Sequence, residues 1–233
     1  MIKRAAVTAR YGGTGRWCPL CEKSARRNKP FGQPERAEAK CPYCGALERH
    51  RLVWLFLERF TDLFSRPGAR VLDFAPLEIF GERFAESPQI QYITADLHFW
   101  NVDLRLDIER LPFADRSFDV VYCSHVLEHV DDDRVAMAHL RRILRPDGWA
   151  IVMVPIMGET TDEDPEVTDP LERIRRFGQS DHVRAYGLDI ATRLRNAGFE
   201  VRVFEPGDVA RNGDGERMQL HGRDEYLFYC SPV

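Results

Sequence analysis

The sequence contains no apolar run that approaches the roughly 18 residues required for a membrane-spanning helix. Residues 1–10 include basic side chains, but they lack the apolar centre and the small-residue cleavage site of a secretory leader. These absences indicate a protein without a membrane partner, and we expect it in the cytoplasm. With 233 residues, 44% hydrophobic and 30% charged, the chain is long enough for one α/β domain with a small appendage.

Cysteines are few, but four of the six form two tight pairs, Cys18-Pro-Leu-Cys21 and Cys41-Pro-Tyr-Cys44. In a cytoplasmic chain such pairs indicate metal ligands before disulfides. Two pairs supply four thiolates and leave no open coordination position, which is typical of structural Zn²⁺. We therefore predict a zinc-knuckle module over residues 1–45. A redox dithiol is the alternative, but neither pair has the strand-to-helix context of that motif.

The charge is unevenly distributed along the chain. Residues 1–51 hold 12 Lys and Arg against 4 Asp and Glu, whereas the remaining residues hold 21 basic and 33 acidic side chains. The basic segment either attracts phosphate or nucleic acid, or it neutralises the charge of about −2 left on a tetrathiolate zinc site. Between the two pairs, the polar residues 22–40 are predicted to form an irregular, exposed loop.

Hydrophobic periodicity places a connecting helix over residues 46–64, within a linking segment 46–68. From residue 69 to residue 233, short apolar runs alternate with amphipathic segments, which predicts an α/β domain with a doubly wound, mostly parallel sheet. The predicted strands are 70–75, 91–96, 118–123, 149–154, 199–204 and 225–230, and the predicted helices are 79–85, 131–144 and 188–197.

Ligands on such sheets lie beyond the carboxyl ends of the strands, where Asp73, Asp96, Asp107 and Ser124 should gather. Asp96 ends the second predicted strand, 23 residues after Asp73. A carboxylate at that position can accept hydrogen bonds from both ribose hydroxyls of a nucleoside cofactor. Acids at strand ends are also common turn formers, so this feature alone is weak.

Three blocks follow in order: DIERLPFADRSFDVV at 107–121, CSHVLEHV at 123–130 and LRPDGW at 144–149. On these blocks, residues 69–233 resemble the class I S-adenosylmethionine (SAM)-dependent methyltransferases, in the small-molecule and ubiquinone-biosynthesis-like group. The segments 41–52 and 177–187 look like a narrower bacterial subfamily with an N-terminal four-cysteine site. The resemblance implies a seven-stranded sheet with an antiparallel last strand, and SAM as the cofactor.

Residue by residue, the resemblance implies that Asp96 holds the ribose hydroxyls and that Asp107 binds the adenine amino group. The full implied SAM set is Asp73, Ala75, Asp96, Leu97, Asp107, Ile108, Ser124 and His125. One departure concerns the first loop, which in the family usually reads Asp-x-Gly-x-Gly-x-Gly. Here residues 73–78 contain no glycine, so we expect different contacts there. Glu78 either replaces some of these contacts or is an acid at a helix start.

The acceptor side is expected in residues 181–186, just before a predicted helix. Asp181 would orient His182 as a general base, and Arg184, with Tyr186, would bind an anionic acceptor. The alternative is a helix-capping cluster with an arginine ion pair. His125 is a further candidate base, although it and His129 also fit a role in shaping the cofactor pocket. The acidic stretch 159–169 is predicted to be a flap or an exposed loop.

Three functions remain open from the sequence. The first is a small-molecule O- or N-methyltransferase with a structural zinc module. The second is an RNA or tRNA methyltransferase that grips nucleic acid with the basic module. Against it, the sequence has no Asn/Asp-Pro-Pro-aromatic motif, and its aromatic residues are not interleaved with basic ones as a stacking platform requires. The third, suggested by the missing glycines, is a non-catalytic protein with the SAM-binding fold. The oligomeric state is not predicted.

Overall fold

The structure, a computed structural model, describes residues 2–32, 34–220 and 226–233. The chain forms two compact units. Unit 1 comprises Met1–Arg66, Leu77–Ser87 and Glu205–Arg223, and unit 2 comprises Pro67–Pro76, Pro88–Phe204 and Asp224–Val233. These units differ from the linear division predicted at residues 45 and 68, because two later segments of the chain fold with the N-terminal part.

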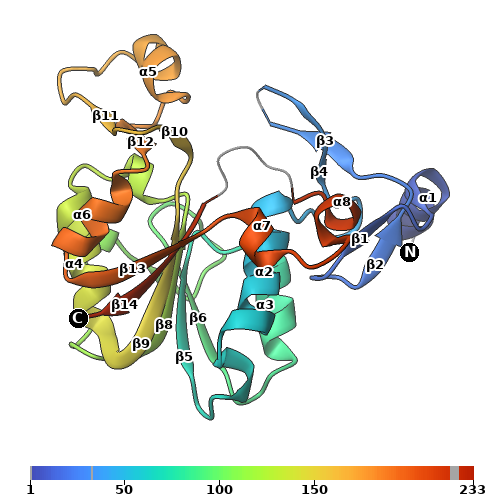
Figure 1. Cartoon of the computed structure of the whole chain (residues 1–233), viewed down its shortest axis with the longest axis horizontal. Coiled ribbons are helices and arrows are strands. Elements are labelled where there is room, and N and C mark those ends of the chain that lie inside the picture. Colours follow the sequence, from blue (N-terminus) through green and yellow to red (C-terminus); the bar gives the residue numbers. More distant parts are fainter. Residues whose placement is uncertain (1, 33, 221–225) are drawn as a thin grey trace. The chain divides into compact units, whose positions relative to one another are not determined.

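Unit 2 is built on a seven-stranded sheet in the order β13-β14-β9-β8-β5-β6-β7 (Figure 1). Strand β14 pairs antiparallel with both β13 and β9, and the other neighbouring strands pair parallel. The predicted α/β class, with a mostly parallel seven-stranded sheet and an antiparallel last strand, is therefore confirmed. The strands are β5 (Arg70–Phe74), β6 (Gln91–Asp96), β7 (Leu104–Arg105), β8 (Phe118–Ser124), β9 (Leu144–Met153), β13 (Phe199–Phe204) and β14 (Leu227–Pro232).

The central strands β5, β8 and β9 are buried along most of their length, as expected for parallel strands that are covered on both faces. In β8, for example, all but one of the seven side chains are buried. Helices α4 (Asp133–Ile143) and α6 (Ile190–Asn196) lie along one face of this sheet in Figure 1. Helix α4 begins where the Asp132 carboxylate accepts hydrogen bonds from the backbone N–H groups of Arg134 and Val135, at 3.0 and 3.2 Å. Short 3₁₀ turns η2 (Ile108–Arg110) and η3 (Leu127–His129) follow β7 and β8.

A second, three-stranded sheet in unit 2 has the order β10-β12-β11. Its strands are β10 (Ile156–Gly158), β11 (Asp162–Glu163) and β12 (Arg184–Gly187), and helix α5 (Pro170–Phe177) lies between β11 and β12 in sequence. The acidic stretch predicted as a flap or loop therefore contributes a strand. It is fixed by ion pairs, because Arg176 contacts Asp162 at 2.7 Å and Asp164 at 2.9 Å.

Unit 1 holds the N-terminal elements together with three later helices. Residues 22–40 are not irregular as predicted, because they contribute to two antiparallel hairpins, β1-β2 and β3-β4. The elements are α1 (Ile2–Tyr11), β1 (Arg16–Cys18), β2 (Lys23–Ala25), β3 (Lys29–Phe31), β4 (Arg36–Lys40), α2 (Glu48–Phe60), η1 (Leu63–Ser65), α3 (Glu78–Ala85), α7 (Pro206–Val209) and α8 (Asp214–Met218).

Helix α2 is the centre of unit 1 and is shorter than the predicted helix over residues 46–64. Its Trp54 packs among Phe64, Phe80 and Phe84, with ring centroids 5.3–6.0 Å away, so the aromatic stripe belongs to the core. The guanidinium of Arg51 is fully buried and donates to the carbonyls of Ala39 and Ala46 at 3.0 and 2.8 Å, and to that of Met218 at 2.6 Å. It thereby joins α2 to the cysteine loop and to α8. Among the described residues, no helix combines the length and apolar character needed to span a membrane.

Candidate functional site

The four predicted metal ligands come together in unit 1. The ligand atoms of Cys18, Cys21, Cys41 and Cys44 all lie within 4.8 Å of one another. Between the two pairs, Cys18 Sγ lies 3.6 Å from Cys44 Sγ, and Cys21 Sγ lies 3.8 Å from Cys41 Sγ. A tetrahedral ion bonded at about 2.3 Å to each sulfur places the sulfurs about 3.8 Å apart, which matches these distances. Two separate redox dithiols would not require the two cysteine pairs to lie in contact with each other.

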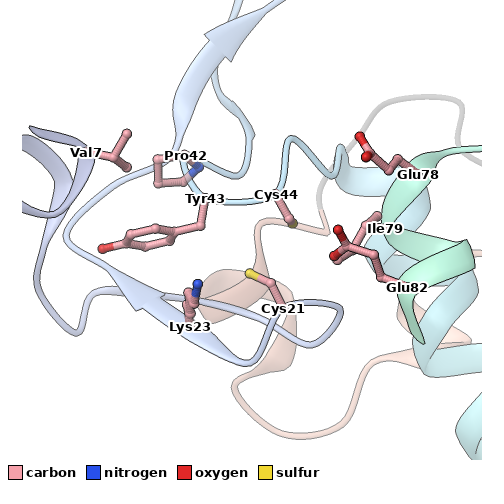
Figure 2. Close-up of a pocket in the computed structure, with 9 residues that line it drawn as sticks. All are labelled: Val7, Cys21, Lys23, Pro42, Tyr43, Cys44, Glu78, Ile79 and Glu82. Carbon is pink, nitrogen blue, oxygen red and sulfur yellow. The ribbon is translucent and has the colours of Figure 1, made fainter. Parts of the chain in front are cut away.

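The turn after the second pair has the backbone that a knuckle requires. Gly45 has φ of +80°, a conformation that favours glycine, and its N–H donates to the carbonyl of Cys41 at 3.0 Å. Beside the cluster, unit 1 contains a cavity of about 300 Å³ whose wall includes Cys21 and Cys44. Figure 2 shows Tyr43 and Lys23 on one side of this cavity, and Glu78 and Glu82 of α3 on the other. Glu78 is the first residue of α3, so the structure favours its role as an acid at a helix start.

In unit 2, strand register places three predicted cofactor residues in one row. Phe74 of β5 lies opposite Ala95 of β6 and opposite Cys123 of β8. The next residues along these strands are Ala75, Asp96 and Ser124, at the carboxyl edge of the sheet. Ligands of α/β sheets bind at this edge.

Asp73 is the most perturbed acid of this edge. Its side chain is 1% exposed, its Oδ2 accepts a hydrogen bond from the Tyr92 hydroxyl, and its Oδ1 has no partner among the described residues. Burial raises the pKa of Asp73 to about 7, although the bond from Tyr92 acts in the opposite direction. Because buried polar atoms are normally paired, the free Oδ1 indicates a position for a polar ligand.

Ser124, on the neighbouring strand, also has a buried polar atom without a partner among the described residues. The residue is buried, and the atom is its Oγ. Ala75 and His125, which follow β5 and β8, both have positive φ, +55° and +57°. This backbone region is sparsely used by residues other than glycine, and such residues concentrate at functional sites. The first loop therefore adopts at Ala75 a conformation that favours glycine, without having a glycine there.

The remaining predicted cofactor residues differ in their surroundings. Oδ1 of Asp96 accepts hydrogen bonds from the N–H groups of His98 and Phe99, at 2.6 and 2.8 Å, which shapes the following loop and leaves Leu97 exposed. Asp107 caps η2 through a hydrogen bond from Glu109 N at 2.9 Å. The side chain of Ile108, a further member of the implied SAM set, is buried in the core of unit 2.

The central strands of this sheet lie in a segment that matches a known protein family. Residues 71–152 match the family described as methyltransferase domain. The chain is 35% identical over 94 residues to O-methyltransferase rstn1 of Aspergillus nomiae, covering 40% of each protein. It is also 35% identical over 71 residues to the ubiquinone/menaquinone biosynthesis C-methyltransferase UbiE of Paraburkholderia phytofirmans, covering 30% of this chain and 26% of that protein. The chain thus spans less than half the length of the curated relatives it matches.

Solved structures share the fold. The 1,6-didemethyltoxoflavin-N1-methyltransferase of Burkholderia thailandensis, solved with 1,6-didemethyltoxoflavin and S-adenosylhomocysteine (SAH), aligns with a TM-score of 0.52 and 17% identity. That alignment covers 80% of this chain and 78% of the other. Residues 71–152 therefore match a methyltransferase domain, and the chain shares its fold with solved methyltransferases. Its sequence match, residues 71–152, includes the edge formed by Asp73, Ala75, Asp96 and Ser124.

On the predicted acceptor side of the methyltransferase domain, Arg184 and Tyr186 are buried in strand β12. Arg184 donates to the carbonyls of Leu127, Val130 and Asp131 at 2.6–2.8 Å, and to the Glu163 carboxylate at 3.2 Å. The hydroxyl of Tyr186 donates to Asp133 at 2.7 Å. These bonds occupy the groups that were predicted to bind an anionic acceptor, so the structure gives both residues a role in holding the fold.

The predicted Asp181–His182 pair does not form. Asp181 lies 3.3 Å from Nδ1 of His129, and His182 is bonded instead to the Phe177 carbonyl at 2.9 Å. The segment does not cap a helix either, because β12 separates it from α6. His125 and His129 do not share a helix face as their spacing would allow, since His125 has a left-handed backbone and η3 starts only at Leu127.

Glu128 is the residue that the sequence analysis missed. It is 1% exposed, and Nδ1 of His125 lies 3.3 Å from its Oε1. Burial alone would raise the pKa of Glu128, but the imidazoles of His125 and His129 outweigh it, and the pKa lies below the ordinary value. Its position between two histidines in the block CSHVLEHV was a usable signal.

The basic N-terminal segment offers little support for nucleic-acid stacking. In unit 1 the Nζ atoms of Lys23, Lys29 and Lys40 lie 5.5, 5.4 and 5.1 Å from the ring centroids of Tyr43, Tyr11 and Phe31. One face of each of these three rings is therefore covered by a cation of the protein itself.

Proposed function

We propose that this protein is a SAM-dependent methyltransferase that acts on a small molecule through an oxygen or nitrogen acceptor. The observation that carries the proposal is a pair of buried polar atoms, Asp73 Oδ1 and Ser124 Oγ, near the ends of adjacent strands, that have no hydrogen-bond partner among the described residues. They lie in the segment that matches the methyltransferase domain family. The oxygen acceptor is supported by the similarity to an O-methyltransferase, and the nitrogen acceptor by the fold shared with an N1-methyltransferase.

In this proposal the residues of the strand edge bind and orient SAM. Asp73 takes the α-ammonium group, whose positive charge favours the ionised form of this buried carboxyl. Asp96 takes the ribose hydroxyls, and Ser124 and His125 line the methionine end. Bound SAM would supply the methyl group to the acceptor atom and leave as SAH, and the proton of the acceptor would pass to water. The enzyme contributes mainly by aligning the two reactants.

Calorimetry of SAH binding to the full chain tests this proposal. We expect saturable binding, weakened about 10- to 100-fold by Asp96→Ala, because a charged hydrogen-bond partner contributes about 1.5–3 kcal/mol. Asp115→Ala is the matched control, since Asp115 is an exposed acid that pairs with Arg142. An absence of binding at millimolar SAH would refute the enzyme and leave the non-catalytic alternative.

We also propose that the four cysteines of unit 1 hold a structural Zn²⁺. The sulfur–sulfur distances fit a tetrahedral ion, and four protein ligands leave no position for water or substrate. The buried Arg51 fixes the loop that carries Cys41 and Cys44, through the carbonyls of Ala39 and Ala46. In this role the metal organises unit 1 and takes no part in methyl transfer.

A further inference from the structure

A second group of potential metal ligands lies in unit 2, separate from the four cysteines. Glu128 and His129 belong to η3, directly after β8, and His182 precedes β12. One ligand atom from each of the three side chains lies within 4.8 Å of the others. Two of the three, Glu128 and His182, are 1% and 3% exposed. Ionisable side chains this deeply buried normally have partners, which makes their remaining free atoms informative.

His182 has the tautomer that a metal ligand needs. Its Nδ1 lies 2.9 Å from the carbonyl oxygen of Phe177. Because a carbonyl oxygen only accepts, Nδ1 carries the proton, and in the neutral ring Nε2 is left with a lone pair. That Nε2 is buried and has no hydrogen-bond partner among the described residues. Histidines that bind metals typically donate their other ring N–H to a carbonyl or a carboxylate in this way.

His129 and Glu128 complete the arrangement. Nδ1 of His129 lies 3.3 Å from the carboxylate of Asp181, and its ring meets that of His182 edge to face with centroids 4.7 Å apart. His129 can thus present Nε2 as a ligand while Asp181 orients the ring. The Oε2 atom of Glu128 has no hydrogen-bond partner within the described part of the chain. Oε2 of Glu128 and Nε2 of His182 thus both offer electron pairs within one small group of side chains, and a cation can bind to both.

The fold holds the three side chains in place. The N–H of Val183 donates to the carbonyl of Glu128 at 2.9 Å. The buried Arg184 binds the carbonyls on both sides, those of Leu127, Val130 and Asp131. These bonds join the turn that carries Glu128 and His129 to the segment that carries His182. A site preorganised in this way binds without the entropic cost of ordering its ligands.

We propose that Glu128, His129 and His182 bind a divalent transition-metal ion. Two imidazoles and one carboxylate suit such ions and leave coordination positions open, unlike the four thiolates of unit 1. The site follows Ser124 by only a few residues at the carboxyl edge of the sheet. Resting on the proposed methyltransferase function, this assigns the acceptor class: a hydroxyl compound whose oxygen the ion binds and whose proton it makes easier to lose to water.

To test this proposal, Mn²⁺ is titrated into the zinc-loaded full chain without SAH or acceptor. The concentration of free Mn²⁺ is measured by electron paramagnetic resonance. Mn²⁺ prefers nitrogen and oxygen ligands and does not compete for a tetrathiolate site. We expect one saturable Mn²⁺ site per chain. Glu128→Gln and His129→Gln should each weaken binding at least 100-fold, and Asp181→Asn about 10-fold, as for an outer-shell partner. His98→Gln, at an exposed histidine, is the matched control and should bind as the unmodified protein does.

A second measurement covers the case in which a variant fails to fold. In the unmodified protein, bound Mn²⁺ should broaden the imidazole resonances of His129 and His182 before that of His98. Absence of a saturable site up to millimolar Mn²⁺, or equal affinity in all four variants, would overturn the proposal. Broadening that spares His129 and His182 would overturn it as well. Since SAH binding is measured separately, failure here is distinguishable from failure of the proposed methyltransferase function.

Discussion

Replacing Asp73 by asparagine should remove a pH dependence from the stability of this protein. Burial raises the pKa of Asp73 from 3.8 to about 7 in the folded chain. Between these two values the folded protein retains a proton that the unfolded chain has lost. The contribution of Asp73 to the free energy of unfolding is therefore fully present below about pH 4 and is lost as the pH rises to 7. Three pH units at about 1.4 kcal/mol each give a total of about 4 kcal/mol.

The assay is urea unfolding of both proteins, followed by circular dichroism at several values between pH 5.5 and pH 7. Other titrating groups, including the four cysteines, are common to both chains and cancel in the difference. We expect the free energy of unfolding of Asp73→Asn, relative to the unmodified protein, to rise by about 2 kcal/mol over this window. The amide can still accept the hydrogen bond from Tyr92, so packing is preserved. A difference that stays constant with pH would refute the buried, protonated state of Asp73.

Three further outcomes follow from the described contacts. Tyr92→Phe should raise the pKa of Asp73 above 7, since the lost hydrogen bond favours the ionised carboxylate; carbon NMR of the side chain measures it, and an unchanged pKa contradicts it. Cys41→Ser should abolish bound zinc and lower the melting temperature, measured by metal analysis and calorimetry, because zinc binding contributes folding energy of order 10 kcal/mol; retained zinc would count against the site. Arg184→Met should lower the free energy of unfolding by about 3–5 kcal/mol, because three carbonyls and Glu163 lose a buried partner. Urea unfolding measures this change, and a value below about 1 kcal/mol would show that these bonds are dispensable.

Local patterns in the sequence predicted much of the fold. The strands at 91–96 and 199–204 were predicted with the bounds that the structure shows, because alternating or continuous apolar residues with clear ends carry a local signal. The last predicted strand began at Glu225, which lies outside the described residues, and the described strand starts at Leu227. The two hairpins to which residues 22–40 contribute were missed. Their strands are three to five residues long and mostly polar, so they become regular only by pairing with a neighbouring strand.

The candidate site was predicted unevenly for a related reason. Cysteine spacing and the acids at strand ends are local features. The structure gathers the four cysteines in unit 1 and places Asp73 and Asp96 on neighbouring strands of unit 2. Arg184 was expected to face an acceptor, but its carbonyl partners lie more than 50 residues earlier in the chain, and no local pattern reports such a pairing. Asp181 and His182 are adjacent in sequence, yet the strand geometry directs them to different partners.

The sequence by itself determined the α/β class, the cysteine pairs and the positions at which strands end in acids. These depend on periodicity and spacing, which act over a few residues. Only the tertiary structure decided which polar groups are buried and which of their atoms have no hydrogen-bond partner among the described residues, as at Asp73, Ser124, Glu128 and His182. Burial and pairing are set by segments that are distant in sequence and adjacent in the fold, and the free energy of a buried charge depends on them. The chemistry proposed for this protein rests on those unpaired groups.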